Sequence, residues 1–73
     1  MATKQVDARG LRCPQPVLKI TTAMPDMQPG DIMEVSADCA TFDEDVRKWC
    51  DRMGKTLLAI TKEGEMSVAQ IRF

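Results

Sequence analysis

Hydrophobic and polar residues follow two different repeats along this chain, and each repeat predicts one kind of element. Strand-like patterns, with apolar and polar positions alternating, occupy residues 4–8, 32–37, 55–62 and 66–73. Apolar residues spaced three and four apart predict two helices, over 14–24 and 42–53. The predicted order is therefore strand, helix, strand, helix, strand, strand.

Local signals set the ends of these elements. Pro25 should end or kink the first helix, because the residue before a proline avoids helical backbone angles. Thr41 and Glu44 match a capping box that opens the second helix, and Gly54 stands where a helix C-terminal glycine belongs. Turns are predicted at residues 28–31 and 63–65.

Composition and charge exclude several classes of protein. The 73 residues are enough for one domain, 1–73, and 44% hydrophobic with 29% charged residues is typical of a globular chain. An isoelectric point near 5.2 argues against nonspecific nucleic-acid binding. The longest apolar run has four residues, 57–60, and the N-terminus lacks a secretory signal, so we expect a cytoplasmic protein without direct membrane contact.

The cysteines narrow the possible chemistry further. The chain has three cysteines and no histidine, which fits neither a disulfide scaffold nor a zinc site and excludes a Cys–His catalytic pair. We expect no metal. Cys50 falls within the apolar stripe of the second helix, beside Trp49 and Met53, and is predicted to be a core residue.

Topology brings the other two cysteines to one place. The strands 4–8 and 32–37 are joined by a helix, so they should be parallel and end on the same edge of the sheet. Cys13 follows the first strand and Cys39 follows the second. Because functional groups in open α/β sheets favour the carboxyl ends of strands, both thiols are candidates for chemistry.

Cys13 has the sequence surroundings of a reactive thiol. Pro14 suits the first position of a helix, which makes Cys13 the N-cap, at the positive end of the helix. With Arg12 and Arg9 as candidate cations, that position lowers the pKa of a thiol and favours the nucleophilic thiolate. The alternative is a cysteine that serves as a small buried hydrophobe.

The second proline changes which donors are left near the sulfur. Pro16 removes a backbone donor that an N-cap side chain often uses, so Gln15 N–H is the main donor expected near Cys13. A phosphate cradle needs several converging N–H groups, and this helix start lacks two of them. The segment therefore favours a rigid mount for one sulfur atom.

Residues 11–17, Leu-Arg-Cys-Pro-Gln-Pro-Val, resemble the Cys-Pro-X-Pro signature of the TusA/SirA-like sulfur carriers. The resemblance extends to residues 7–10, to the turn at 29–31 and to 37–41, and so covers essentially the whole chain. It implies an α+β fold, a two-layer α/β sandwich in the order βαβαββ, with two helices on one face of a four-stranded mixed sheet.

The resemblance also implies sulfurtransferase-type chemistry without a cofactor. Cys13 would accept sulfur as a persulfide or thiosulfonate and pass it to a partner protein. Expected donors are a cysteine desulfurase or a rhodanese-like protein, and DsrE-type proteins are expected acceptors, in tRNA thiolation, molybdenum-cofactor assembly or dissimilatory sulfur oxidation. Two departures stand out, because many relatives have proline in place of Cys39 and often continue the first helix past Pro25.

Three functions remain open at this stage. In the leading one, Cys13 carries sulfur, Pro14 and Pro16 make the mount, and Arg12, Gln15 and Arg9 support or dock. The second is a thiol-disulfide redox switch that uses Cys13 and Cys39. The third is a noncatalytic binding or regulatory module, whose RNA-binding version the acidic isoelectric point counts against. Nothing indicates a long apolar interface, so we expect a monomer.

Overall fold

A computed structural model describes residues 3–12 and 15–73 of the chain. Four strands and two helices follow one another as β1 (Thr3–Asp7), α1 (Gln15–Ala23), β2 (Ile32–Ala37), α2 (Phe42–Met53), β3 (Thr56–Glu63) and β4 (Met66–Arg72). A short 3-10 turn, η1 (Met24–Asp26), follows α1. This confirms the predicted order, with boundaries that shift by at most one residue.

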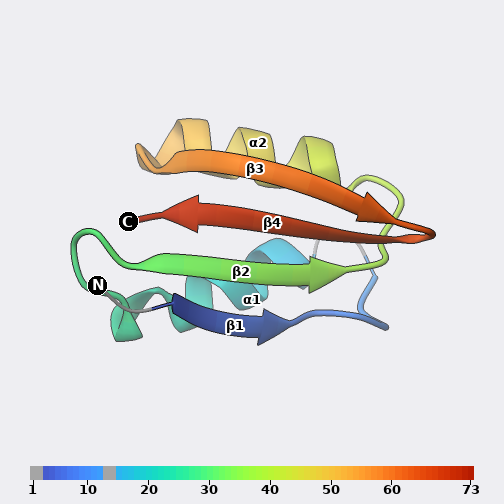
Figure 1. The fold of residues 1–73 in the computed structure, drawn as a ribbon, viewed down its shortest axis with the longest axis horizontal. Coiled ribbons are helices and arrows are strands. Elements are labelled where there is room, and N and C mark those ends of the chain that lie inside the picture. Colours follow the sequence, from blue (N-terminus) through green and yellow to red (C-terminus); the bar gives the residue numbers. More distant parts are fainter. Residues whose placement is uncertain (1–2, 13–14) are drawn as a thin grey trace.

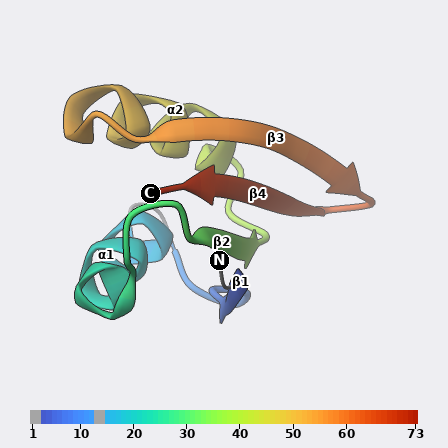
Figure 2. The same ribbon diagram turned by 60° about the vertical axis from the view of Figure 1, so that its left-hand side comes forward.

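The strands form one mixed sheet in the order β1-β2-β4-β3. β1 and β2 are parallel, as the crossover through α1 predicts, and β4 runs antiparallel to both of its neighbours. Both helices lie behind the sheet in Figure 1, and the rotated view in Figure 2 shows them on the same side. The structure thus has the α+β two-layer architecture that the resemblance implies.

The core fills the space between the sheet and the helices. Alternation in β2 turns Met33, Val35 and Ala37 toward the helices, and all three are fully buried. The helices contribute the largest buried side chains of their apolar stripes, among them Ile20, Phe42, Val46 and Trp49. Cys50 is also buried, which confirms its predicted place in the core.

Strand β3 departs from simple alternation through a bulge. Its pairing with β4 shifts register between Leu57 and Ala59, which leaves Leu58 as the extra residue. Leu57 and Ile60, three apart in sequence, can therefore both pack against the core, while Leu58 is 43% exposed. The sequence pattern alone did not predict this irregularity.

The helix ends follow the local signals with one exception. α1 ends at Ala23, ahead of the 3-10 turn that contains Pro25, and Gly54 caps α2 with a left-handed φ of 70°. The predicted capping box is wrong, because Thr41 Oγ1 donates to Asp45 Oδ2 at 3.0 Å and makes no side-chain cap bond. The hydroxyl is instead turned toward a carboxylate one turn along the helix, to which it donates.

None of the described helices has the length and apolar character needed to cross a membrane.

Candidate functional site

The loops that follow β1 and β2 leave the sheet side by side. The parallel register pairs Asp7 with Ser36, so the two strands end at the same edge (Figure 1). Arg12 and Gln15 bracket the Cys-Pro pair of the signature, while Cys13 and Pro14 themselves lie outside the described residues. The topology therefore brings the segment before Cys13 and the loop of Cys39 to one edge, as predicted.

The backbone of the loop after β1 is closely held. Four consecutive N–H groups of this loop donate to acceptors within the same edge of the sheet. These bonds run from Ala8 N to Ser36 O at 2.7 Å, from Arg9 N to Asp7 Oδ1 at 3.1 Å, from Gly10 N to Asp38 Oδ1 at 3.0 Å, and from Leu11 N to Ala8 O at 3.4 Å. Two of the four acceptors are carboxylates, so the loop depends on charge-assisted bonds.

Asp7 organises the first half of this loop. Its carboxylate accepts from Arg9 Nε at 2.9 Å and from Arg9 Nη2 at 3.0 Å, in addition to the Arg9 N–H. These hydrogen bonds lower the pKa of Asp7 from 3.8 to about 2 and raise the pKa of Arg9. Lys19 Nζ, from α1, donates to the Asp7 carbonyl oxygen. The guanidinium of Arg9 is thus held by the Asp7 carboxylate and stabilises the conformation of the loop.

Arg12 differs from Arg9 in its surroundings. Its side chain is exposed, and within the part of the chain that the structure describes its guanidinium has no ion pair. Its carbonyl oxygen accepts the Gln15 N–H at 2.7 Å. The Gln15 N–H therefore already has one acceptor, and its predicted part as a donor near the Cys13 sulfur stays a prediction, because Cys13 lies outside the described residues.

Pro16 is fully buried in the first turn of α1. Gln15 and Leu18, its neighbours on the outer side of the helix, are exposed, and Leu18 is 59% exposed. A proline ring in the core cannot rotate or shift without disturbing its packing. This burial fits the predicted role of Pro16 as part of a rigid mount.

The two described cysteines differ in state. Cys39 is half-buried, is disulfide-bonded, and has its Sγ 3.7 Å from Thr41 Oγ1. Cys50 is a free buried thiol, and burial raises its pKa. The predicted Cys13–Cys39 pair involves Cys13, which lies outside the described residues, so this pairing stays a prediction.

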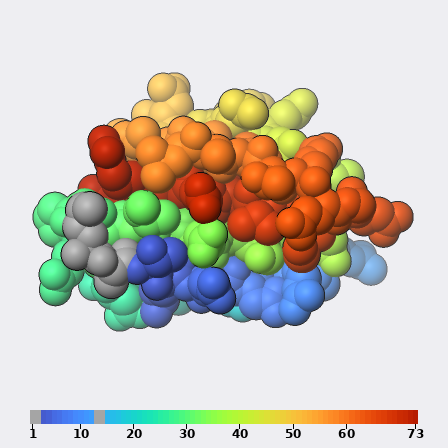
Figure 3. Space-filling view, viewed as in Figure 1, coloured from blue at the N-terminus to red at the C-terminus, as the bar shows by residue number. Residues whose placement is uncertain are grey.

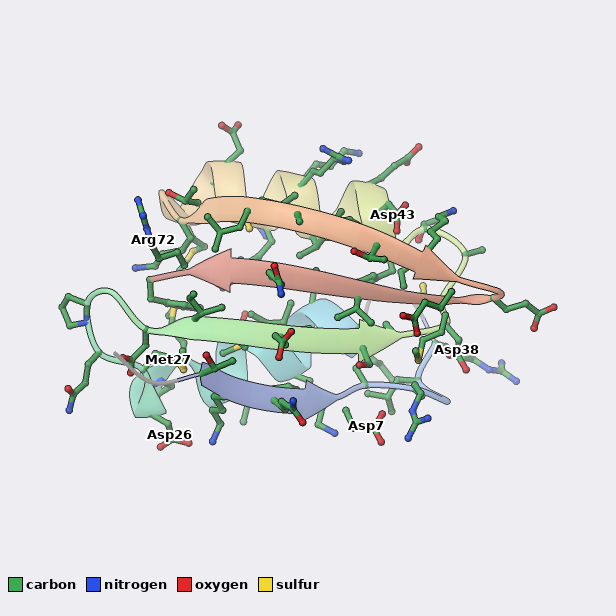
Figure 4. All side chains as sticks on the ribbon, viewed as in Figure 1. Asp7, Asp26, Met27, Asp38, Asp43 and Arg72 are labelled. Carbon is green, nitrogen blue, oxygen red and sulfur yellow. The ribbon has the colours of Figure 1, made fainter. Side chains whose placement is uncertain are left out.

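Sequence reasoning missed three side chains that shape the edge: Asp7, Lys19 and Asp38. Figure 4 shows Asp7 and Asp38 at the same end of the molecule, where β1 and β2 end. Asp7 and Asp38 fall within the segments 7–10 and 37–41 of the family resemblance, but nothing in the sequence indicated that they or Lys19 hold the loop. Among residues 3–12 and 15–73, no three Cys, Asp or Glu side chains gather in the manner of metal ligands.

Comparison with known proteins assigns the family. The family model for sulfurtransferase TusA matches residues 4–72. YrkI of Bacillus subtilis, named as a candidate sulfur carrier, is 36% identical over 63 residues, which cover 86% of this chain and 84% of that protein. YrkF of Bacillus subtilis and a protein of Aquifex aeolicus, named in the same way, are 34% and 30% identical over 89% and 94% of this chain.

The chain spans about a third of the length of YrkF and of the Aquifex protein, 35% in each case. Among solved structures, the SirA-like protein of Desulfitobacterium hafniense has the same fold, with a TM-score of 0.79 over 99% of this chain and 96% of that one, at 24% identity. The family model covers nearly the whole chain, and this match assigns the chain to a family. The chain belongs to the sulfurtransferase TusA family.

Proposed function

We propose that this protein is a sulfur carrier in which Cys13 accepts a sulfur atom and delivers it to a partner protein. The observation that carries the proposal is the place of the Cys-Pro-Gln-Pro segment. It follows β1 at the edge where β1 and β2 both end, in a chain that matches the TusA family over residues 4–72. A carrier needs an exposed thiol at such an edge and no enclosed substrate pocket.

The proposed chemistry is a thiol-persulfide exchange. The Cys13 thiolate attacks the outer sulfur of a donor persulfide, a new S–S bond forms at Cys13, and the donor leaves as a thiolate. Delivery repeats the same exchange, with the acceptor as nucleophile. The electrons balance without an external oxidant. With tetrathionate as donor, the Cys13 thiolate would attack a central sulfur, gain the –S–SO3⁻ group through a new S–S bond and release thiosulfate.

The neighbouring residues take separate parts in this proposal. Pro14 and Pro16 hold the segment rigid, and the burial of Pro16 supports this. Arg12 is the exposed cation that favours the thiolate and meets the partner, with Gln15 beside it. Arg9, paired with Asp7, acts on the loop instead of on the sulfur.

We further propose that the donor is a cysteine desulfurase or a rhodanese-like protein and the acceptor a DsrE-type or similar protein. The end use would be tRNA thiolation, molybdenum-cofactor assembly or dissimilatory sulfur oxidation. The identity of the productive donor distinguishes these uses. Thiol-persulfide exchange needs a reduced thiol, which a reducing compartment maintains, and we place the carrier in the cytoplasm.

Intact-protein mass spectrometry tests the carrier. Reduced wild type, Cys13→Ser and Cys39→Ser are incubated with a cysteine desulfurase plus cysteine, and separately with a rhodanese plus thiosulfate. We expect a reductant-labile gain of one sulfur atom in wild type and Cys39→Ser, and none in Cys13→Ser. If the folded wild type gains no sulfur from any donor, the carrier proposal fails and a binding or regulatory module takes its place.

The disulfide bond of Cys39 is an observation that favours a second function, a thiol-disulfide switch. In a thiol-disulfide switch, the Cys39 thiolate would attack the inner sulfur of a Cys13 persulfide, form a Cys13–Cys39 disulfide and expel hydrosulfide. The outer sulfur of the persulfide is reduced to hydrosulfide, and it takes up the two electrons that the two cysteines lose when their disulfide forms. The switch requires a reversible Cys13–Cys39 disulfide and loss of function in Cys39→Ser. A Cys39→Ser protein that transfers sulfur normally, together with no such disulfide in wild type, would exclude it.

A further inference from the structure

A side-chain hydrogen bond joins the two loops at the functional edge. Asp38 lies directly after β2, and its Oδ1 accepts the Gly10 N–H at 3.0 Å across 28 positions of sequence. Figure 4 shows Asp38 at the end of the molecule where β1 and β2 leave the sheet. The loop before Cys13 is thus tied to the loop that carries Cys39.

Gly10 is the point at which the chain changes direction. Its φ of 82° is left-handed, which glycine adopts without strain. Cys13 is three residues further on, and three Cα–Cα steps reach at most about 11 Å. A small rotation at Gly10 would therefore move the whole short segment that leads to Cys13.

The charge of Asp38 has the wrong sign for activating a thiol. A carboxylate near a thiolate raises the pKa of the thiol by repulsion. Asparagine would accept the same hydrogen bond without the negative charge. The charge of Asp38 also acts on Arg9, whose pKa it helps to raise, but toward the thiol it is unfavourable. Its contribution to the Cys13 segment therefore lies in the geometry of the bond it accepts.

We propose that Asp38 is a positioning residue for sulfur transfer: it holds Gly10, and through Gly10 sets the approach of the Cys13 segment to the partner protein. This inference rests on the proposed carrier function. Asp38 lies in the loop between β2 and α2, and in this proposal it acts through Gly10 without contacting the sulfur.

A matched pair of variants separates geometry from charge. Asp38→Asn keeps the acceptor and removes the charge, while Asp38→Ala removes both. Sulfur loading from the donor is measured against pH, so that each variant is compared at full ionisation of its thiol. Because misplacement of about 1 Å can cost up to ~100-fold in rate, we expect Asp38→Ala to load ~10-fold more slowly and Asp38→Asn to stay within ~2-fold of wild type.

Gly10→Ala perturbs the same point from the other side of the bond. A Cβ on Gly10 meets no atom of residues 3–12 and 15–73 within 4 Å, and its left-handed φ makes alanine strained there, so this change acts on the backbone conformation. We expect it to slow loading as Asp38→Ala does. Thermal melting confirms that each variant is folded at the assay temperature, and hydrogen exchange at Gly10 reports the bond directly: slow in wild type and Asp38→Asn, fast in Asp38→Ala.

Two results would overturn the inference. Asp38→Ala that loads at the wild-type rate would show that the bond has no effect on the site, and Asp38→Asn that loses as much as Asp38→Ala would point to charge. The failure of the carrier proposal is distinguishable, since wild type would then gain no sulfur at all. In that case the rate of iodoacetamide alkylation of Cys13, extrapolated to full ionisation of the thiol, tests the role of Asp38. A rate that differs between the two Asp38 variants supports the positioning role, and equal rates overturn it.

Discussion

Asp7 shows how a single surface carboxylate can organise a functional loop. It accepts the Arg9 N–H, binds the Arg9 guanidinium through two nitrogens and, through its carbonyl oxygen, receives Lys19. Each bond uses a group on the β1–α1 loop or on the helix that follows. Asp7 therefore couples the end of β1 to both the loop and α1.

The lowered pKa of Asp7 predicts an acid dependence of stability. The folded value of about 2 lies below the ordinary 3.8, so the contribution is complete above about pH 4 and is lost as the pH falls toward 2. We expect the urea midpoint of wild type to fall more steeply between pH 4 and pH 2 than that of Asp7→Asn. Parallel curves, or a carboxyl pKa near 3.8 by NMR, would contradict this.

Arg12 and Arg9 should differ in function although both are exposed arginines near Cys13. Arg9 is paired with Asp7, whereas Arg12 has no ion pair within the described part of the chain. We expect Arg12→Gln to slow sulfur loading several-fold, with a weaker dependence on salt, because a rim charge mainly affects association. Arg9→Gln should lower stability more than loading rate. Equal effects of both variants on the salt dependence of loading would contradict this assignment.

The Cys50 thiol should be chemically silent in the folded protein. It is 3% exposed, and burial raises its pKa. Cys50→Ser places a hydroxyl in an apolar site and should lower the free energy of unfolding by about 1–3 kcal/mol, measured by urea denaturation. Cys50→Ala is the control for the loss of the sulfur itself. Rapid reaction of Cys50 with a thiol reagent in native buffer would contradict its burial.

At the scale of elements, one hydrogen bond ties the two helices together. The indole Nε1 of Trp49 in α2 donates to Thr21 Oγ1 in α1 at 3.0 Å, and Trp49 is 2% exposed. Thr21→Val leaves the indole N–H without this acceptor, which should cost about 1–3 kcal/mol of stability. Thr22→Val is the matched control. Thr21 Oγ1 donates to Val17 O, and Thr22 Oγ1 makes the equivalent bond to Leu18 O on the exposed side of the helix. Equal losses in the two variants would show that the Trp49 bond contributes nothing.

The end of α2 depends on a left-handed residue. Gly54 has a φ of 70°, and its N–H and that of Lys55 both donate to Cys50 O. A Cβ at this position meets no atom of the described residues within 4 Å, so Gly54→Ala adds the conformational cost of about 1–2 kcal/mol. Gly54→Asn should cost less, since asparagine tolerates this conformation. Thermal unfolding of the two variants checks the order, and an alanine variant as stable as wild type would contradict it.

At the scale of the whole molecule, the sheet separates a covered face from an open one. The helices cover one face, and Figure 3 shows the other, which side chains from all four strands form. Across three strands Glu34 accepts from Gln5 Nε2 at 3.4 Å and from Gln70 Nε2 at 3.0 Å. This polar belt allows the open face to remain in water without helices over it.

Much of this arrangement was predictable because it depends on local pattern. Apolar periodicity and the turn residues predicted the element order, and the crossover through α1 predicted parallel β1 and β2. The error concerns a side-chain hydrogen bond. Thr41 Oγ1 donates to Asp45 and makes no cap bond with the backbone. More than one partner lies within reach of such a hydroxyl, and the pattern of residues does not rank them.

The alternation of the strands, the apolar stripes of the helices and the signature around Cys13 can be seen in the sequence, since each is a property of neighbouring residues. Which groups from distant segments meet depends on the folded arrangement. Gly10 and Asp38 are 28 positions apart, and Thr21 and Trp49 are equally distant. These contacts depend on how the loops and helices pack on the sheet, and packing is a property of the whole chain that no short window of sequence contains.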